Sequence, residues 1–315
     1  MSLLLKALIA PLVFLLAALP ARAADPLVSV EWVKANLGKP GIVLLDVRSG
    51  AGRTKADYLA GHIPGAVFTD YAKDDWRERT PDGVDGQIPP VDKLEKLIGG
   101  LGIDNATHVV LIPEGRAAVD VASATRLYWT FKVLGHDNLS LLDGGFLAWM
   151  RDVDKHKKPV NQMETTDVKL PPKTFKANVR QEMLVSKGDV KKAIAEKTTI
   201  VDNRPQDFHV GLSKSPSVKR YGTLPGAQSI PESWLTDNNG GTFRSKAQLV
   251  KLYQSQNVPT SGKQVSFCNT GHWASLGWFV ASEILGNKDA QMYSGSMADW
   301  TADPSLPVEQ KVKTE

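Results

Sequence analysis

The amino-acid sequence predicts an α/β protein of two tandem domains, each with a mostly parallel sheet flanked by helices. The first observation is a repeat, because the same landmarks recur in the same order at a spacing of about 155 residues. The second is an alternation of short β-branched runs with helical patterns, which is typical of parallel sheets. The third is size, since 315 residues with 42% hydrophobic and 23% charged side chains are enough for two globular domains.

Each copy begins with a buried-strand candidate followed by an Asp-x-Arg motif, Asp46 with Arg48 and Asp202 with Arg204. We expect these short-range pairs to support the loops structurally rather than to take part in the chemistry. A Gly-x-x-Pro-Gly-Ala turn follows, then a second apolar run, then a helical stretch that ends in Leu-Gly. Each copy closes with a glycine and a tryptophan. In the first copy these elements lie at 42–45, 61–66, 109–113, 116–134 and 144–149, and in the second at 199–202, 222–227, 264–268, 276–285 and 295–300.

The repeat sets the predicted domain boundaries. The first domain covers residues 27–150 and the second covers 177–302, followed by a C-terminal tail over 303–315. The segment 151–176 between the domains is polar, lysine-rich and carries three prolines, so it is interpreted as a linker.

The amino terminus has the pattern of a secretory signal peptide over residues 1–23. Lys6 precedes an apolar stretch of 13 residues (7–19), which is shorter than the 20 or so that a membrane span needs. Ala21-Arg22-Ala23 then provides the small residues that signal peptidase accepts. We expect export to a bacterial periplasm with cleavage after Ala23, and no membrane attachment afterwards.

Charge and residue counts exclude several classes of function. A net charge of +4, spread along the chain, gives no reason to expect a nucleic-acid partner. The six histidines show no metal-binding spacing and the chain has a single cysteine, so neither a metal site nor an intramolecular disulfide is predicted. No nucleotide-binding motif is present, and no cofactor is expected.

The single cysteine, Cys268, is the strongest candidate for chemistry. It follows the apolar run 264–267 and precedes a short loop and an apolar helical stretch. Backbone N–H groups of such a loop, together with the following helix N-terminus, can converge on one point and favour an anion there. A field of this kind favours the thiolate, which is the reactive form of cysteine, so Cys268 is predicted to be a nucleophile.

Taken together, these landmarks resemble the two-domain rhodanese-type sulfurtransferases, over about residues 27–300. The resemblance implies two rhodanese-like domains, of which the second is catalytic. The first copy has Pro113 in place of Cys268 and is therefore expected to be inactive. It also implies that Cys268 takes a sulfane sulfur from a small donor, becomes a persulfide, and passes the sulfur to a thiophilic acceptor in ping-pong fashion.

The sulfur donor stays open, with thiosulfate expected and 3-mercaptopyruvate as the alternative. Thiosulfate-using members resemble Cys-Arg-Lys-Gly-x-Thr in the loop, whereas mercaptopyruvate-using members resemble Cys-Gly-x-Gly-x-Thr. This loop departs from both patterns and carries no cation. Phe208 also stands where such enzymes tend to place an arginine. Lys219 and Arg220 are possible sources of positive charge, but the sequence does not place them.

The loop residues after Cys268 are predicted to bind the substrate. His272 is a candidate hydrogen-bond donor or a cation near neutral pH, and Gly271 matches the family's loop glycine. Trp273 is a candidate pocket wall, and the hydroxyls and amide of the loop are candidate hydrogen-bond donors. The predicted substrate-binding set is Asn269, Thr270, Gly271, His272, Trp273 and Ser275.

Two alternatives remain beside the enzyme. A persulfide carrier would hold sulfur on Cys268 for a dedicated protein partner, and the first domain would then be a possible docking surface. A phosphatase on the same fold is excluded in practice, because it needs an arginine six residues after the cysteine and that position is Ala274.

Overall fold

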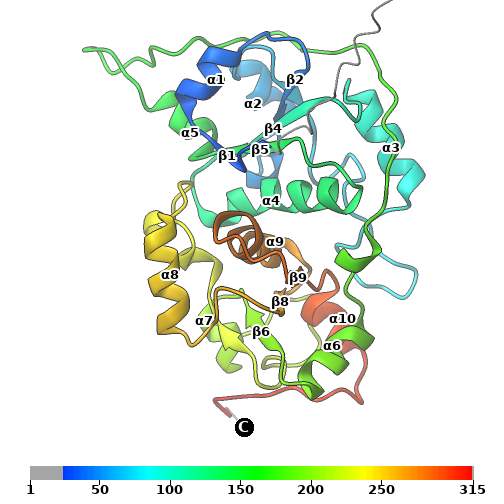
Figure 1. Cartoon of the computed structure of the whole chain (residues 1–315). Helices are drawn as coiled ribbons and strands as arrows, with labels where there is room; N and C mark the ends of the chain where they lie inside the picture. Colours follow the sequence, from blue (N-terminus) through cyan, green and yellow to red (C-terminus); the bar gives the residue numbers. More distant parts are fainter. Residues whose placement is uncertain (1–23, 314–315) are drawn as a thin grey trace, which may run out of the picture.

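The structure is a computed structural model that describes residues 24–313 (Figure 1). It shows two α/β domains whose sheets are separated by a pair of packed helices. The predicted signal peptide, residues 1–23, lies outside the described residues. Within the described part of the chain, no helix has the length and apolar character to cross a bilayer.

The first domain is built on a five-stranded parallel sheet with the order β1-β5-β4-β2-β3. The central strands are almost wholly apolar because helices cover both faces of the sheet. Its elements are β1 (Leu27–Val28), α1 (Val30–Asn36), β2 (Ile42–Asp46), the 3₁₀ turn η1 (Arg48–Ala51), α2 (Lys55–Ala60), β3 (Val67–Phe68), α3 (Val91–Gly100), β4 (His108–Ile112), α4 (Ala118–Val133), β5 (Leu139–Leu142) and α5 (Gly145–Met150).

The second domain repeats this plan with four parallel strands in the order β7-β6-β8-β9. Among residues 24–313, no counterpart of β1 lies at the edge of this sheet. Its elements are η2 (Gln181–Met183), α6 (Lys187–Ala195), β6 (Thr199–Asp202), α7 (Gln206–Val210), β7 (Gln228–Ser229), η3 (Glu232–Trp234), η4 (Asp237–Asn239), α8 (Lys246–Ser255), β8 (Gln264–Phe267), α9 (His272–Phe279), the π-helical turn η5 (Val280–Ile284), β9 (Ala290–Met292) and α10 (Ser296–Ala302).

The predicted fold class is confirmed, because both copies are parallel sheets flanked by helices. The strand candidates at 42–45 and 109–112 are β2 and β4, and the helix expected over 116–134 is α4. Signals within a single element, such as an apolar run or a helical repeat, were sufficient for these predictions.

The segment 151–176 is not a free tether, since it runs along the first domain and is fastened to it. His62 and Glu164 form an isolated antiparallel bridge, and the Gly65 N–H donates to the Glu164 carboxylate at 2.7 Å. Near the end of the segment, Phe175 is 2% exposed and packs on Phe131 of α4. The polar composition of the segment concealed these anchors.

Helices α4 and α9 pack against each other and join the two domains (Figure 1). Both are buried on nearly every side because each is sandwiched between its own sheet and the other helix. One hydrophobic core therefore runs across the interface and includes Tyr128 of α4 and Phe279 of α9, whose rings meet edge to face at 4.9 Å. The loop before α9 is thus held between the two domains.

Candidate active site

Cys268 lies directly after β8, in the four-residue loop that leads into α9. The neighbouring strands β6 and β9 end at the same edge of the sheet, where parallel α/β sheets place their sites. The side chain is 1% exposed and forms no disulfide. Its position is the one that the sequence predicts.

Two backbone N–H groups of the loop converge on one point, and that point is the hydroxyl of Ser296. The Cys268 N–H donates to Ser296 Oγ at 3.0 Å and the Gly271 N–H at 3.2 Å. The hydroxyl donates in turn to the Tyr293 carbonyl at 2.9 Å and lies 3.9 Å from Cys268 Sγ. Ser296 is therefore the polar group of α10 that organises the cysteine loop.

Ser296 adopts a left-handed conformation with φ +51°. Such a φ is unfavourable for any residue with a Cβ, and strain of this kind is concentrated at functional sites. The repeat places Gly145, with φ +60°, at the same position of the first domain, 151 residues earlier. No role was predicted for Ser296 from the sequence. The signal that could have identified it is a serine directly after Gly295, where the first domain has a glycine.

Gly271 is the residue that allows α4 of the first domain to reach the loop. It has φ +74°, and a Cβ there would lie 2.3 Å from a guanidinium nitrogen of Arg126. Arg126 donates to the Gly271 carbonyl at 3.2 Å and to the Gly86 carbonyl at 2.8 Å. The glycine predicted in this loop thus leaves room for an arginine from the other domain.

Arg126 and Arg77 bring two positive charges to the loop from the first domain. Arg126 is fully buried, and burial lowers the pKa of its guanidinium to about 10. Arg77 is half-buried and stacks over the ring of Tyr71 at 4.6 Å. Neither arginine has a carboxylate partner within residues 24–313, and the Nε of each is buried without a hydrogen bond there. The sequence did not predict that these arginines lie beside the loop, because both are more than 140 positions before Cys268 in the chain.

His272 joins the loop to the first domain through both nitrogens of its ring. Nε2 lies 3.0 Å from the Val119 carbonyl, which only accepts, so Nε2 carries the proton and donates. Nδ1 lies 2.8 Å from the Tyr71 hydroxyl and accepts from it. Burial, with Arg77 nearby, lowers the pKa of His272 to about 3. The ring is therefore neutral at neutral pH, which corrects the expectation of a cation at this position.

The remaining predicted loop residues face different surroundings. Asn269 is 7% exposed and its Oδ1 has no partner among the described residues, while Thr270 is half-buried against Gly86. Trp273 packs near Phe208, with 6.3 Å between the ring centroids. The substrate contacts predicted for these side chains remain predictions.

Ser275 lies one helical turn into α9 and faces α4. Its hydroxyl is fully buried, lies 2.9 Å from the Thr125 hydroxyl and 3.2 Å from the Ala122 carbonyl. Ser275 does not cap α9, whose N-cap is Gly271. The geometry gives it a place in the contact between the domains.

Arg220 and Lys219 lie in a different part of the second domain. The Arg220 guanidinium donates to the carbonyls of Leu306 at 2.7 Å and Asp303 at 2.8 Å, so it holds the C-terminal segment. The Lys219 side chain is exposed, and its backbone N–H donates to Thr301. The cations at the loop are the arginines of the first domain.

Asp202 and Arg204 form a completely buried ion pair at the end of β6, with 2.6 Å between the charged groups. Arg204 also donates to the Gly222 carbonyl, and Asp202 accepts from the Thr223 hydroxyl at 2.7 Å. Burial alone would raise the pKa of Asp202, but Arg204 and the hydrogen bonds to the carboxylate lower it below its usual range. The pair ties the strand to the Gly-x-x-Pro-Gly-Ala turn, as expected of structural support.

Comparison with known proteins places this geometry in a family. The model of the Rhodanese-like domain matches residues 29–152 and again residues 186–303. A Mycobacterium bovis protein named "Putative thiosulfate sulfurtransferase 1" is 30% identical over 292 residues, covering 90% of this chain and 98% of its own length. A similarly named protein of Haloferax volcanii is also 30% identical, over 302 residues, covering 91% and 97%.

Two solved structures share the fold. SseA from Escherichia coli, described as a 3-mercaptopyruvate sulfotransferase, superposes with a TM-score of 0.71 at 25% identity and covers 87% of this chain and 99% of its own. EanB superposes with a TM-score of 0.73 at 23% identity, covering 91% of this chain and 70% of its own. The EanB similarity shows the fold alone.

Proposed function

Because the chain belongs to the rhodanese family of tandem-domain sulfurtransferases, we propose that it transfers the outer sulfur of thiosulfate to a thiophilic acceptor through a persulfide on Cys268. The observation that carries the choice of donor is the pair of arginines beside the loop, Arg77 and Arg126, which have no carboxylate partner among residues 24–313. Uncompensated buried cations are costly, and an anionic ligand removes that cost. Thiosulfate is a small dianion of suitable charge.

The proposed reaction has two steps. The Cys268 thiolate attacks the outer sulfur of thiosulfate, a new sulfur–sulfur bond forms, and sulfite leaves with the electron pair of the broken bond. The acceptor then attacks the terminal sulfur of the persulfide, and the Cys268 thiolate is regenerated. The Ser296 hydroxyl accepts from two loop N–H groups and lies 3.9 Å from the buried sulfur, a water-poor setting in which fixed dipoles act strongly on an anionic sulfur.

His272 supports this reaction as a positioning residue. Its two hydrogen bonds, to Tyr71 and Val119, fix the start of α9 against the first domain. Because the ring is neutral, the charge that attracts the donor comes from the arginines. The first domain therefore lacks a nucleophile but provides the electrostatics of the site.

3-Mercaptopyruvate is the second candidate donor, because its carboxylate also suits an arginine and because the chain resembles SseA. A third candidate function of the same site is that of a persulfide carrier for a protein partner. In each case the acceptor is a thiophilic small molecule or protein. We also propose export to the periplasm, on the pattern of residues 1–23.

Intact mass after treatment with thiosulfate, without reductant, tests the proposal. The wild-type chain is expected to gain one sulfur atom, and cyanide is expected to remove it as thiocyanate. Cys268→Ser is expected to gain none. A chain that gains sulfur from 3-mercaptopyruvate but not from thiosulfate would overturn the choice of donor, and a gain by Cys268→Ser would overturn the site.

Arg77→Gln tests the role of the first-domain charge, because Arg77 is half-buried and makes no ion pair among the described residues. The KM for thiosulfate is expected to rise about tenfold, the value of a lost charge-assisted contact. The rate of sulfur transfer from a preformed persulfide to cyanide is expected to stay unchanged. Arg79→Gln, on the exposed surface nearby, is the matched control.

A further inference from the structure

The outer edge of the second sheet is open where the same edge of the first sheet is covered. In the first domain, β1 pairs with β5, and Leu141 N–H donates to Pro26 O at 2.9 Å and Asp143 N–H to Val28 O at 3.0 Å. In the second domain β9 is the last strand, with no strand of the described chain on its outer side. The two domains therefore differ by one strand.

The unpaired groups of β9 can be identified from the repeat. Met292 and Ser294 lie 151 residues after Leu141 and Asp143. Tyr293 N–H donates inward to Ser266 of β8 at 2.9 Å, so the alternating groups of Met292 and Ser294 point outward. No acceptor for these two N–H groups is found within residues 24–313.

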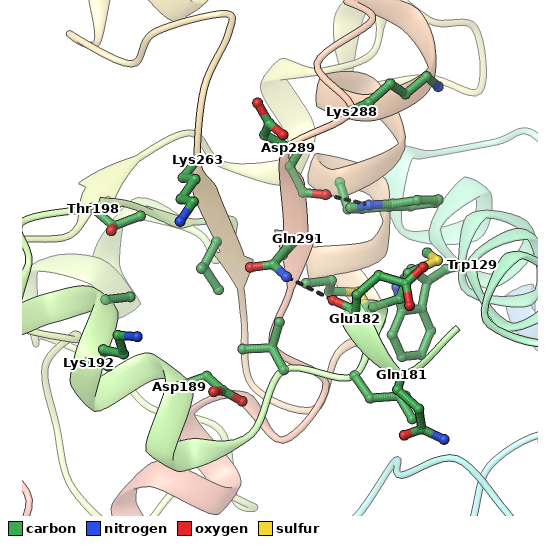
Figure 2. A pocket seen from close by; sticks show the side chains of 18 of the residues that line it. Trp129, Gln181, Glu182, Asp189, Lys192, Thr198, Lys263, Lys288, Asp289 and Gln291 are labelled. Carbon is green, nitrogen blue, oxygen red and sulfur yellow. Dashed lines mark hydrogen bonds between the residues drawn. The ribbon is translucent and has the colours of Figure 1, made fainter. Parts of the chain in front are cut away.

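The segment that repeats β1 is present but stands away from β9. Leu184-Val185-Ser186 repeats Leu27-Val28-Ser29, and a cavity of about 550 Å³ separates it from the edge strand (Figure 2). The Leu184 N–H is used within η2, donating to Gln181 at 3.0 Å, and Ser186 caps α6. The Gln291 side chain spans the gap to the Glu182 carbonyl at 2.8 Å.

The lining of this cavity combines apolar side chains with charges of both signs, namely Lys192, Lys263, Lys288, Glu182, Asp189, Glu196 and Asp289. Apolar side chains of β8 and β9, Val265 and Met292, line it together with Trp129 of α4. Lys263, at the start of β8, is exposed and has no ion-pair partner in the described part of the chain. The strand that covers the equivalent edge in the first domain has an acidic residue, Asp25, just before Leu27 and Val28.

We propose that the cavity binds an extended segment of a partner protein, which adds to β9 as a parallel strand. The segment carries an acidic residue near Lys263, followed by two apolar residues over Val265 and Met292. Its carbonyls accept from Met292 and Ser294, and one of its N–H groups donates to Met292 O, as in strand addition at other sheet edges. Because parallel strands end at the same edge, the partner's chain leaves the cavity on the side where Cys268 lies.

Amide hydrogen exchange on the whole ¹⁵N-labelled chain tests this proposal. In the free protein, Leu141 and Asp143 amides are expected to exchange at least about a hundredfold more slowly than those of Met292 and Ser294. A capped peptide with the sequence of residues 24–30 is then added as the probe. At saturation it is expected to slow exchange at Met292 and Ser294 about tenfold or more.

Matched controls distinguish strand addition from nonspecific binding of the peptide. The same peptide N-methylated at its first valine nitrogen loses the donor for Met292 O and is expected not to protect the edge. Lys263→Glu is expected to weaken binding about threefold, the scale of one exposed ion pair. Lys246→Glu, at another exposed lysine, the first residue of α8, is expected to leave binding unchanged.

Three outcomes would overturn the proposal. Full protection of Met292 and Ser294 in dilute, peptide-free protein would mean that the chain covers its own edge. Protection that grows with protein concentration would identify a second copy as the occupant. Unchanged exchange at saturating peptide would mean that the edge does not accept a strand. None of these outcomes bears on the mass test of sulfur transfer.

Discussion

In the first domain, the loop after the second core strand begins with Pro113, whereas in the second domain it begins with Cys268. The backbone around the two loops is nearly the same. Phe146 N–H donates to the Pro113 carbonyl at 2.8 Å, as Met297 N–H does to the Cys268 carbonyl at 3.0 Å. A shared scaffold therefore carries a cysteine loop in one domain and a proline loop in the other.

The two loops differ in the side chains that surround them. In the first domain, a Cβ on Gly145 would lie 2.4 Å from the Pro113 carbonyl, so the loop closes on bare backbone. Glu114 then fills the loop with a buried carboxylate that pairs with Arg53 at 2.7 Å. In the second domain Ser296 replaces the glycine and directs a hydroxyl at the cysteine loop. The two loops thus differ in the residue that the closing helix brings to them as well as in the cysteine.

The largest expected effect separates the two loops directly. Cys268→Ser is expected to lower sulfur transfer by at least about a thousandfold, because the reaction loses its nucleophile. Pro113→Cys in that variant is expected to restore nothing, since the buried Glu114 carboxylate opposes a thiolate and no hydroxyl stands at position 145. The measurement is thiocyanate formation from thiosulfate and cyanide. Activity in the double variant would show that the scaffold alone is sufficient.

Ser296→Gly makes the second domain resemble the first at its closing helix. Two loop N–H groups lose their acceptor, so transfer is expected to fall about tenfold to a hundredfold, equivalent to one or two lost hydrogen bonds. Stability is expected to change little, because glycine relieves the strain at φ +51° while the hydrogen bonds are lost. Ser296→Ala keeps the strain and loses the hydroxyl.

Comparing kcat and the urea midpoint across wild type, Ser296→Gly and Ser296→Ala isolates the role of the hydroxyl. We expect equal losses of activity in the two variants, with only the alanine variant unfolding at a lower urea concentration. If Ser296→Ala keeps its activity, the loop N–H groups act on the thiol without the Ser296 hydroxyl.

The buried Asp-x-Arg pairs offer a comparison of stability. Asp202 accepts a hydroxyl hydrogen bond from Thr223, and its pKa lies below its usual range, whereas burial raises the pKa of Asp46. A carboxylate whose pKa is lowered in the folded state contributes stability above its unfolded pKa of about 3.9, and that contribution is lost as pH falls below it. The second domain is therefore the one whose Asp-x-Arg pair is stabilising at neutral pH and weakened by acid.

Thr223→Val removes one of the hydrogen bonds to the Asp202 carboxylate without changing the side-chain shape greatly. Unfolding free energy at pH 7 is expected to fall by about 1.5–3 kcal/mol, the range for a hydrogen bond to a charged group. The gap between variant and wild type is expected to narrow only as pH falls through the lowered folded-state pKa of Asp202, because the unfolded chains of the two proteins take up the proton alike. Urea denaturation at pH 7 and pH 3.5 measures the two unfolding free energies, and a gap that has already closed at pH 3.5 would contradict the lowered pKa of Asp202.

The sequence predicted the parts of the site whose residues are close together in the chain, and missed the parts that come from distant residues. The position of Cys268 was predicted because its strand, loop and helix are contiguous, whereas the hydroxyl on which the loop N–H groups converge belongs to a later helix. Ser296 comes from the next helix, and Arg126 from the other domain, so neither is within reach of a local pattern. The loop itself lacks cations, and the two arginines beside it, Arg77 and Arg126, come from the other domain.

The smallest expected effect concerns His272. The question is whether His272 acts through its hydrogen bonds to the first domain or through a positive charge. Its pKa of about 3 keeps the ring neutral, so its NMR signals are expected to show no titration between pH 5 and 8. Tyr71→Phe removes the hydroxyl that donates to Nδ1 and is expected to lower transfer only about twofold to fivefold, the value of one neutral hydrogen bond. A titration with a midpoint between pH 5 and 8 would instead make His272 a cation in the working enzyme. The pH dependence of KM for thiosulfate would then follow that midpoint, whereas a neutral ring leaves KM flat across the same range.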